Sequence, residues 1–312
     1  MSLTDSCDCP VDLPLIRGDE SETAGYVAAT QSPWPGGVAF YASPETTDFR
    51  LAALASAPAT TGQLLDALVP GPAGRLDKAS RVRVKIDRGE LSSASQTAML
   101  AGANLAAVRN ANGGWELIQF QNAVLTAPAT YELSAMLRAL SGTDPEMSPG
   151  APAGSRFVLI DATVPPVALN AAEVGLPLVW RYGPADRDFG EESYAGATHT
   201  FAGLARRPLS PVHLRGKRDS GDLTITWIRR TRSGGDSWET LDVPLAEESE
   251  RYEIDILDGV NVIRTIPTDT PSAVYAQAQQ IADFGAAPSS ITLRVSQISA
   301  AWGRGPATEA TI

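Results

Sequence analysis

Short stretches in which apolar and polar residues alternate recur along the chain. Residues 81–87 read Arg-Val-Arg-Val-Lys-Ile-Asp, and residues 115–121 read Trp-Glu-Leu-Ile-Gln-Phe-Gln. A period of two places the apolar side chains on one face of a strand and the polar ones on the other. The Asn-Gly-Gly sequence at 112–114 is typical of a tight turn leading into the second stretch. These patterns predict antiparallel strands with one buried and one solvated face.

The region from 37 to 205 is predicted to be a β-rich domain with minor helix. Short apolar runs bounded by Gly and Pro predict further strands, at residues 38–42, 49–55, 131–140, 156–161 and 176–182. Residues 95–108, rich in Ala, Met and Leu, favour a helix or turns, and residues 61–68 favour one or two helical turns.

The last module is predicted to span residues 206–312, after a hinge near residues 205–210. Strand-like runs recur in it at residues 223–228, 251–257, 260–266 and 291–298. Short strands at this spacing over about 100 residues are typical of a β-sandwich. The predicted fold class is therefore mainly β, with a β-rich domain followed by a sandwich.

Residues 1–36 are predicted to form an extended N-terminal arm or the trailing end of a preceding module, because prolines flank an acidic stretch at 19–22. The apolar residues Leu13, Leu15 and Ile16 are expected to anchor this arm against a neighbouring subunit. The first residues carry no basic and apolar leader pattern, so synthesis in the cytoplasm without secretion is expected.

Composition and charge narrow the function classes. The 312 residues include 27 Gly and 23 Pro, which favours many strands and turns over long helices. A net charge of −11 without a basic stripe excludes nucleic acid as the expected partner. The chain also has no apolar run long enough for a membrane-spanning helix.

Catalytic and metal-binding chemistry find little support in the sequence. The chain has two histidines, His199 and His213, and neither lies near a nucleophile-elbow motif, so both are interpreted as structural. Cys7 and Cys9 have neither the spacing nor the further ligands of a structural zinc site, and free thiols are expected. We predict no catalytic residue, no bound cofactor and no metal.

The segment 186–192 gathers four carboxylates around a turn. A solvated acidic loop is the simplest interpretation. A Ca²⁺ loop is an alternative, although the spacing is not that of an EF-hand. The carboxylates of Asp188 and Glu191 could also serve as a pair in glycoside hydrolysis, but no aromatic subsites accompany them.

A Gly-rich loop near residues 232–239 carries the candidate contact residues Trp238, Asp236 and Arg232. A rigid aromatic side chain at a loop tip buries a large area at low entropic cost, which suits contact with a host surface or a partner. The alternative is that Trp238 folds back over the edge of the sandwich.

The last module resembles a fibronectin type III domain. Pro208 and Pro211 precede its first strand, and Trp227 ends a Leu-Thr-Ile-Thr-Trp motif at the position of the core Trp of that family. Residues 293–299 and the Trp-Gly-Arg-Gly-Pro sequence at 302–306 match the penultimate strand and the turn into the last one. The sequence departs from the family at Leu293, where a Tyr is usual, so the tyrosine corner is missing.

A larger part of the chain resembles the C-terminal region of host-specificity (megatron-like) tail-tip proteins. These proteins belong to gene transfer agents and related siphophages of alphaproteobacteria. Blocks carrying the resemblance occur in the same order over roughly residues 37–312, at residues 102–104, 115–120, 133–144, 156–161, 175–181 and 209–215.

The resemblance implies a virion structural protein at the distal end of the tail. It implies a subunit below the hub, a homotrimer, and contacts with other tail-tip and hub proteins. Host-surface recognition, with a receptor or polysaccharide as partner, and fibre attachment are implied as further roles. The glycoside-hydrolase-like TIM barrel that usually precedes this region is absent from these residues, so we do not expect an enzyme. The alternatives left open are a cell-surface polysaccharide hydrolase and an adhesin.

Overall fold

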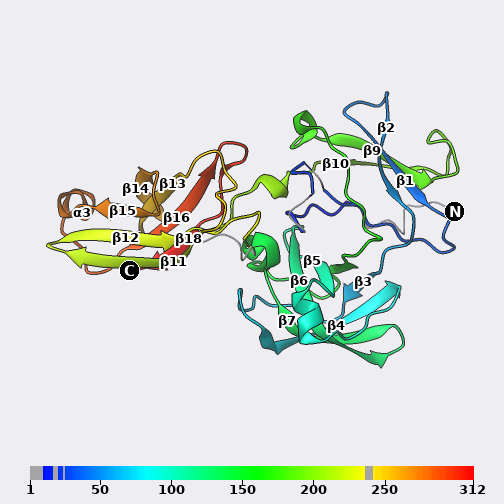
Figure 1. The fold of residues 1–312 in the computed structure, drawn as a ribbon, viewed down its shortest axis with the longest axis horizontal. Coiled ribbons are helices and arrows are strands. Elements are labelled where there is room, and N and C mark those ends of the chain that lie inside the picture. The colour runs from blue at the N-terminus through cyan, green and yellow to red at the C-terminus, as the bar shows by residue number, and fades with distance from the viewer. Residues whose placement is uncertain (1–9, 17–19, 24, 236–241) are drawn as a thin grey trace. The chain divides into compact units, whose positions relative to one another are not determined.

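The structure is a computed structural model that describes residues 10–16, 20–23, 25–235 and 242–312 (Figure 1). The chain is 43% strand and 9% helix, which confirms the mainly β fold class. It divides into two compact units, one ending at Ala205 and one beginning at Arg206. No helix among the described residues is long and apolar enough to cross a membrane.

The first unit contains a four-stranded antiparallel sheet. Its strands are β1 (Val38–Ser43), β2 (Arg50–Ala55), β9 (Leu178–Pro184) and β10 (Ala195–His199), in the order β10-β9-β1-β2. Phe40 of β1 is buried and stacks on Tyr182 of β9, with ring centroids 5.9 Å apart. Trp180 and Phe201 meet edge to face in the same core.

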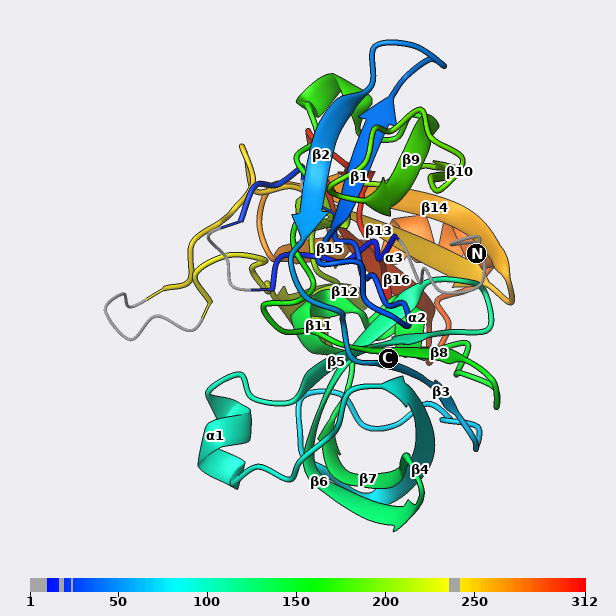
Figure 2. The same cartoon turned by 90° about the vertical axis from the view of Figure 1, so that its right-hand side faces the viewer.

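The same unit contains a closed six-stranded barrel, seen nearly end-on in Figure 2. Its strands are β3 (Thr61–Leu64), β4 (Asp77–Arg88), β5 (Leu105–Arg109), β6 (Trp115–Ala127), β7 (Thr130–Leu137) and β8 (Arg156–Leu159), closed in the order β3-β4-β7-β6-β5-β8. Val82, Val84 and Ile86 alternate inward from β4 with exposed charged residues between them, which confirms the predicted half-buried strand.

The strand predicted at residues 115–121 is confirmed as part of β6, but its predicted solvated face is wrong. Ile118 and Phe120 belong to the barrel core, whereas Trp115 and Leu117 are buried on the opposite side. The N-terminal segment covers Trp115 and Leu117 on that second side. Gln119 is buried as well, and its Nε2 donates to the carbonyl oxygens of Met99 and Ala103.

The packing of the N-terminal segment on β6 corrects the expectation that its apolar residues contact a neighbouring subunit. Val11, Leu13 and Tyr26 share a buried cluster with Trp115 and Leu117, and the backbones of Val11 and Tyr26 exchange two hydrogen bonds of 2.8 and 3.0 Å. Leu13 is therefore buried within its own chain instead of anchoring a neighbouring subunit. Its apolar surface is removed from water on folding of a single chain.

The helical elements of the first unit are short. They are α1 (Gln96–Leu100), α2 (Asp144–Met147), η2 (Leu140–Gly142), η3 (Ala171–Glu173) and η4 (Leu204–Arg206). The Ser95 side chain caps α1 by accepting a hydrogen bond from the Ala98 amide. Gly102 and Asn104 then take positive φ angles and end the helix, so residues 105–109 form β5 and the helix predicted over 95–108 is too long.

The helical turns predicted at residues 61–68 are also wrong, because residues 61–64 form β3. Thr61 pairs with Val158 of β8 and with Arg88 of β4, so two neighbouring strands satisfy its backbone. Gly62 is needed here, since a Cβ atom would lie 2.4 Å from the Lys85 carbonyl oxygen of the adjacent strand.

The second unit has two sheets around one core. One sheet has the order β11 (Val212–Asp219), β12 (Asp222–Ile228), β15 (Ser272–Tyr275). The other contains β14 (Asn261–Thr268), β13 (Tyr252–Asp258), β16 (Thr292–Ser299), β17 (Gly303–Arg304) and β18 (Thr308–Thr311), with α3 (Gln277–Phe284) preceding β16. Trp227 of β12 meets Tyr252 of β13 edge to face at 5.0 Å, which joins the two sheets.

Candidate functional site

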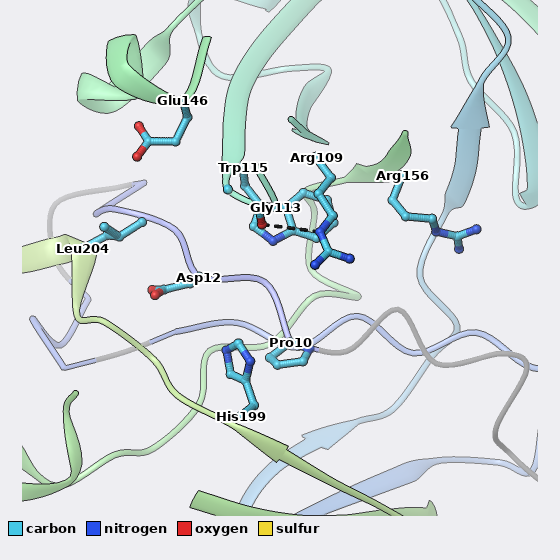
Figure 3. A pocket seen from close by; sticks show the side chains of 10 residues that line it. Pro10, Asp12, Arg109, Gly113, Trp115, Glu146, Arg156, His199 and Leu204 are labelled. Atoms are coloured by element: carbon cyan, nitrogen blue, oxygen red, sulfur yellow. Dashed lines mark hydrogen bonds between the residues drawn. The ribbon is translucent and has the colours of Figure 1, made fainter. Parts of the chain in front are cut away.

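A polar cavity of about 400 Å³ lies within the first unit (Figure 3). Its lining comes from the N-terminal segment, the barrel, and the end of β10 with the turn that follows: Pro10, Asp12, Arg109, Gly113, Gly114, Trp115, Glu146, Arg156, His199 and Leu204. A concave site with several convergent polar groups is the usual setting for binding a small ligand.

Arg109 reaches the cavity from the last position of β5. Its Nε donates a hydrogen bond to the carbonyl oxygen of Gly113 at 3.3 Å, drawn as a dashed line in Figure 3. The Asn110 side-chain oxygen accepts from the amides of Asn112 and Gly114, both at 2.9 Å, and so holds the turn between β5 and β6. The turn requires a positive φ of 89° at Gly113. The guanidinium is therefore attached to a rigid hairpin.

His199 enters from the last position of β10. Its ring meets Phe201 edge to face at a centroid distance of 4.7 Å and an angle of 83°, which restrains its orientation. Its Nε2 is buried and forms no hydrogen bond with the described residues. Burial lowers the pKa of the His199 imidazole, and the positive charge of Arg109 lowers that pKa further. The imidazole is therefore neutral at neutral pH.

Two carboxylates and a second guanidinium complete the polar lining. Asp12 Oδ2 accepts a hydrogen bond of 2.7 Å from the Ala202 amide. Glu146 lies on α2, and its carbonyl oxygen accepts from Asn110 Nδ2 at 2.8 Å. Arg156 Nη1 lies 3.2 Å from Asp87 Oδ2. Hydrogen-bond donors and acceptors thus surround the same space.

The shift of the His199 pKa gives a prediction for pH dependence. We expect the His199 imidazole to titrate below its ordinary value of 6.5. Between those two pKa values the unfolded chain binds more protons than the folded one, so the free energy of unfolding falls as the pH falls through that window. NMR titration of the imidazole signals, assigned with His213→Gln, measures the pKa directly. In His199→Gln this part of the pH dependence should be missing, and a His199 pKa above 6.5 would contradict the burial argument.

The contact residues predicted from the sequence are only partly described. Trp238 and Asp236 lie outside the described residues. Arg232 is described: its Nε donates to Glu247 Oε1 at 3.0 Å and its Nη2 to the Ala246 carbonyl oxygen at 2.6 Å. The Arg232 side chain is 10% exposed, and its ion pair with Glu247 holds the base of the loop together. A role of these three residues in partner contact stays a prediction.

The acidic segment 186–192 forms an ordered loop. Asp188 Oδ1 accepts from the Gly190 amide at 2.8 Å, and Phe189 packs against Tyr41 and Phe49 with centroid distances of 5.2 and 5.8 Å. Within the part of the chain that the structure describes, no group of three or more His, Cys, Asp or Glu side chains could hold a metal ion. Cys7 and Cys9 fall outside that part.

The cavity residues were not recognisable as a site from the sequence. His199 was interpreted as structural, and Asp12, Arg109 and Glu146 carried no motif at all. Asp12 and His199 lie 187 positions apart in the sequence. Only the packing of three segments brings these residues together. Local spacing carries no signal for such an arrangement.

The six-stranded barrel is the part of the chain that matches a known family. Residues 59–158, about a third of the chain, match the family described as Rcc01698-like, C-terminal. These bounds are nearly those of the barrel, which begins at Thr61 and ends at Leu159. The family is that of a protein associated with the gene transfer agent of Rhodobacter capsulatus, so the barrel is similar to a region of a gene-transfer-agent protein.

Other comparisons add little. No curated protein matches the chain. Among solved structures, the chain is similar to the rat CD45 extracellular region, domains d3–d4, with 12% sequence identity and a TM-score of 0.25. The match covers 38% of this chain and 54% of that one, so the chain spans about half the length of that structure. At this TM-score the likeness carries no argument.

Proposed function

We propose that the protein is a structural component of the tail tip of a phage or gene transfer agent, assembling below the hub as a homotrimer. The observation that carries this proposal is the family match over residues 59–158, which coincides with one complete closed barrel. A match that begins and ends with a folded unit indicates a shared domain and not a shared short motif.

Exposed apolar side chains on the barrel support an assembly role. The first half of β6 is buried, whereas Val124 and Leu125 in its second half are 55% and 60% exposed. Leu100 on α1 and Val69 before β4 are exposed as well. Adjacent exposed apolar residues such as Val124 and Leu125 are typical of surfaces that contact other proteins.

Assembly through the β6–β7 hairpin can be tested with a double variant, Val124→Thr with Leu125→Gln. Because both side chains are exposed, we expect the free energy of unfolding to change by less than about 0.5 kcal/mol each. Incorporation into purified particles, measured by immunoblot, should fall strongly. Leu176→Gln, at a similarly exposed position outside the barrel, serves as the matched control and should be incorporated normally. Normal incorporation of the double variant would exclude this hairpin as an assembly surface.

Host-surface recognition or fibre attachment is proposed as a second role, located in the second unit. The strand order supports a fibronectin type III-like sandwich. One sheet has the order β11-β12-β15, and the other contains β14-β13-β16 followed by β17 and β18. Such sandwiches present their loops at the two ends, where partner contacts are made. The loop containing Arg232, Asp236 and Trp238 is the proposed contact segment.

We propose that the chain itself is not an enzyme, and a polysaccharide hydrolase is the alternative. Incubation with host envelope followed by an assay for released sugars distinguishes the two. Sugar release that disappears in Asp188→Asn and Glu191→Gln would favour the hydrolase alternative.

Localisation on the particle tests the main proposal directly. Gold-labelled antibody against this chain should decorate the distal end of the tail in negative-stain images of purified particles. Label that is absent from particles, or found only on heads, would overturn the proposal.

A further inference from the structure

We propose that the polar cavity of the first unit binds one neutral sugar unit of a polysaccharide. The contacts would come from Asp12, Arg109, Trp115, Glu146 and His199, which all line the cavity. This inference rests on the proposed function only for the source of the sugar. The cavity itself is a property of the first unit alone.

The charge of the lining favours an uncharged ligand. Two carboxylates, Asp12 and Glu146, and two guanidinium groups, Arg109 and Arg156, line the cavity, and Arg156 forms an ion pair with Asp87. The lining thus carries charges of both signs, and His199 is neutral at neutral pH because burial lowers its pKa. A strongly anionic ligand would be repelled by the two carboxylates, and a strongly cationic ligand by the two guanidinium groups.

The hydrogen-bonding groups suit a ligand with several hydroxyl groups. Carboxylates only accept hydrogen bonds, guanidinium groups only donate them, and a neutral imidazole offers one nitrogen of each kind. A hydroxyl group donates and accepts, so a polyol can use all three kinds of group at once. Nε2 of His199 is buried and forms no hydrogen bond with the described residues, so a ligand hydroxyl that reaches it would satisfy it. A fully ionised phosphate has no donor and would use only the donors of this set.

Apolar groups complete the match to a sugar ring. Pro10, Trp115 and Leu204 contribute apolar surface to the cavity beside the polar groups. A pyranose ring carries hydroxyl groups around its edge and C–H groups on its faces, so it needs both kinds of surface. A volume of about 400 Å³ lies at the lower end of the range for small-molecule pockets, which accommodates a single ring and not a long oligosaccharide.

The polar groups are held in place before any ligand binds. Phe201 restrains the His199 ring, the Asn110-supported turn carries Arg109, and the Ala202 amide holds Asp12. A preformed site loses little conformational entropy on binding, so even a small ligand can bind measurably.

The test uses the full-length chain and NMR signals of its two histidine imidazoles. The neutral probes are D-glucose, D-galactose and N-acetyl-D-glucosamine. The charged comparisons are D-glucuronate, D-glucosamine and inorganic phosphate. Each compound is titrated to about 50 mM, which saturates a site of roughly millimolar affinity. We expect at least one neutral sugar to shift the His199 signal saturably while the His213 signal stays unchanged. No saturable shift with any neutral sugar would overturn the proposal, as would tighter binding of a charged comparison.

Variants establish where the sugar binds. Arg109→Met and His199→Phe should each weaken binding at least about 10-fold, equivalent to about 1.4 kcal/mol, and His199→Gln should weaken it less. Because His199→Phe lacks the reporting imidazole, calorimetry measures its affinity. Arg81→Met, the same charge change on an exposed face of the barrel, is the matched control and should bind normally. Equal affinity of the Arg109 and Arg81 variants would overturn the assignment of the cavity.

Failure of this inference and failure of the proposed function are distinguishable. Label at the tail end without sugar binding would remove the cavity as a sugar site and leave the tail-tip proposal intact. If the chain binds sugar but the antibody never detects it on particles, the sugar site would stand and the tail-tip proposal would be overturned.

Discussion

Arg138→Met is expected to lower the free energy of unfolding of the first unit by about 3–5 kcal/mol. Arg138 directly follows β7, and its side chain is fully buried. It forms a bidentate ion pair with Glu116 of β6, at 2.6 Å from Nε to Oε1 and 2.8 Å from Nη2 to Oε2. Without Arg138 the carboxylate of Glu116, whose side chain is 3% exposed, would stay in the interior without its partner. The cost of that uncompensated charge is the physical reason for the large effect.

A second buried carboxylate adds to the dependence on Arg138. Burial alone would raise the pKa of Asp77, but hydrogen bonds from Ser80 and Ala79 and the charge of Arg138 together lower it. Arg138 Nη1 also donates to the carbonyl oxygen of Val69, at 3.2 Å. One guanidinium thus joins β6, β7 and the segment leading to β4, and its loss affects all three.

The measurement is urea-induced unfolding of the full chain, following the transition of the first unit. Arg81→Met is the matched control, because Arg81 pairs with Glu132 on the same barrel at 3.2 Å with 60% and 35% of the two side chains exposed. A pair of that kind contributes about 0–1 kcal/mol. Glu116→Gln combined with Arg138→Met should recover part of the loss. A cost of Arg138→Met equal to that of Arg81→Met would contradict the argument from burial.

Trp227→Ala is expected to destabilise the second unit by about 3–5 kcal/mol, the usual cost of removing a large buried aromatic side chain. Trp227 is 4% exposed and packs edge to face on Tyr252, so it contacts the facing sheet of the sandwich. Its removal deletes apolar contacts from both sheets and leaves a cavity between them.

Two unfolding transitions separate this effect from any on the first unit. Since the chain divides at residues 205/206, Trp227→Ala should lower the midpoint of one transition and leave the other unchanged. Ile228→Ala, at the next position but 56% exposed, is the control and should change the free energy by less than about 0.5 kcal/mol. Equal shifts of both transitions would show that the two units do not unfold separately.

The sequence by itself determined the strands whose pattern is local. Alternation at residues 81–87 predicted an inner face of Val82, Val84 and Ile86, and the structure confirms it. The fold class and the strands around Trp227 follow from the same reasoning, because period-two patterning and turn residues act over a few positions. The helix predicted within residues 95–108 ends early for a local reason as well, because Gly102 and Asn104 have positive φ angles.

Only the tertiary structure decided which surfaces are covered and which residues meet. Thr61 pairs with Val158 across nearly one hundred positions to close the barrel, and no pattern near Thr61 signals that pairing. The N-terminal segment covers the outer side of β6, which turned a predicted solvated face into a second core. The Arg138–Glu116 pair and the cavity around His199 arise in the same way. Burial and proximity of polar groups depend on long-range packing, whereas sequence patterns report the preference of each short segment alone.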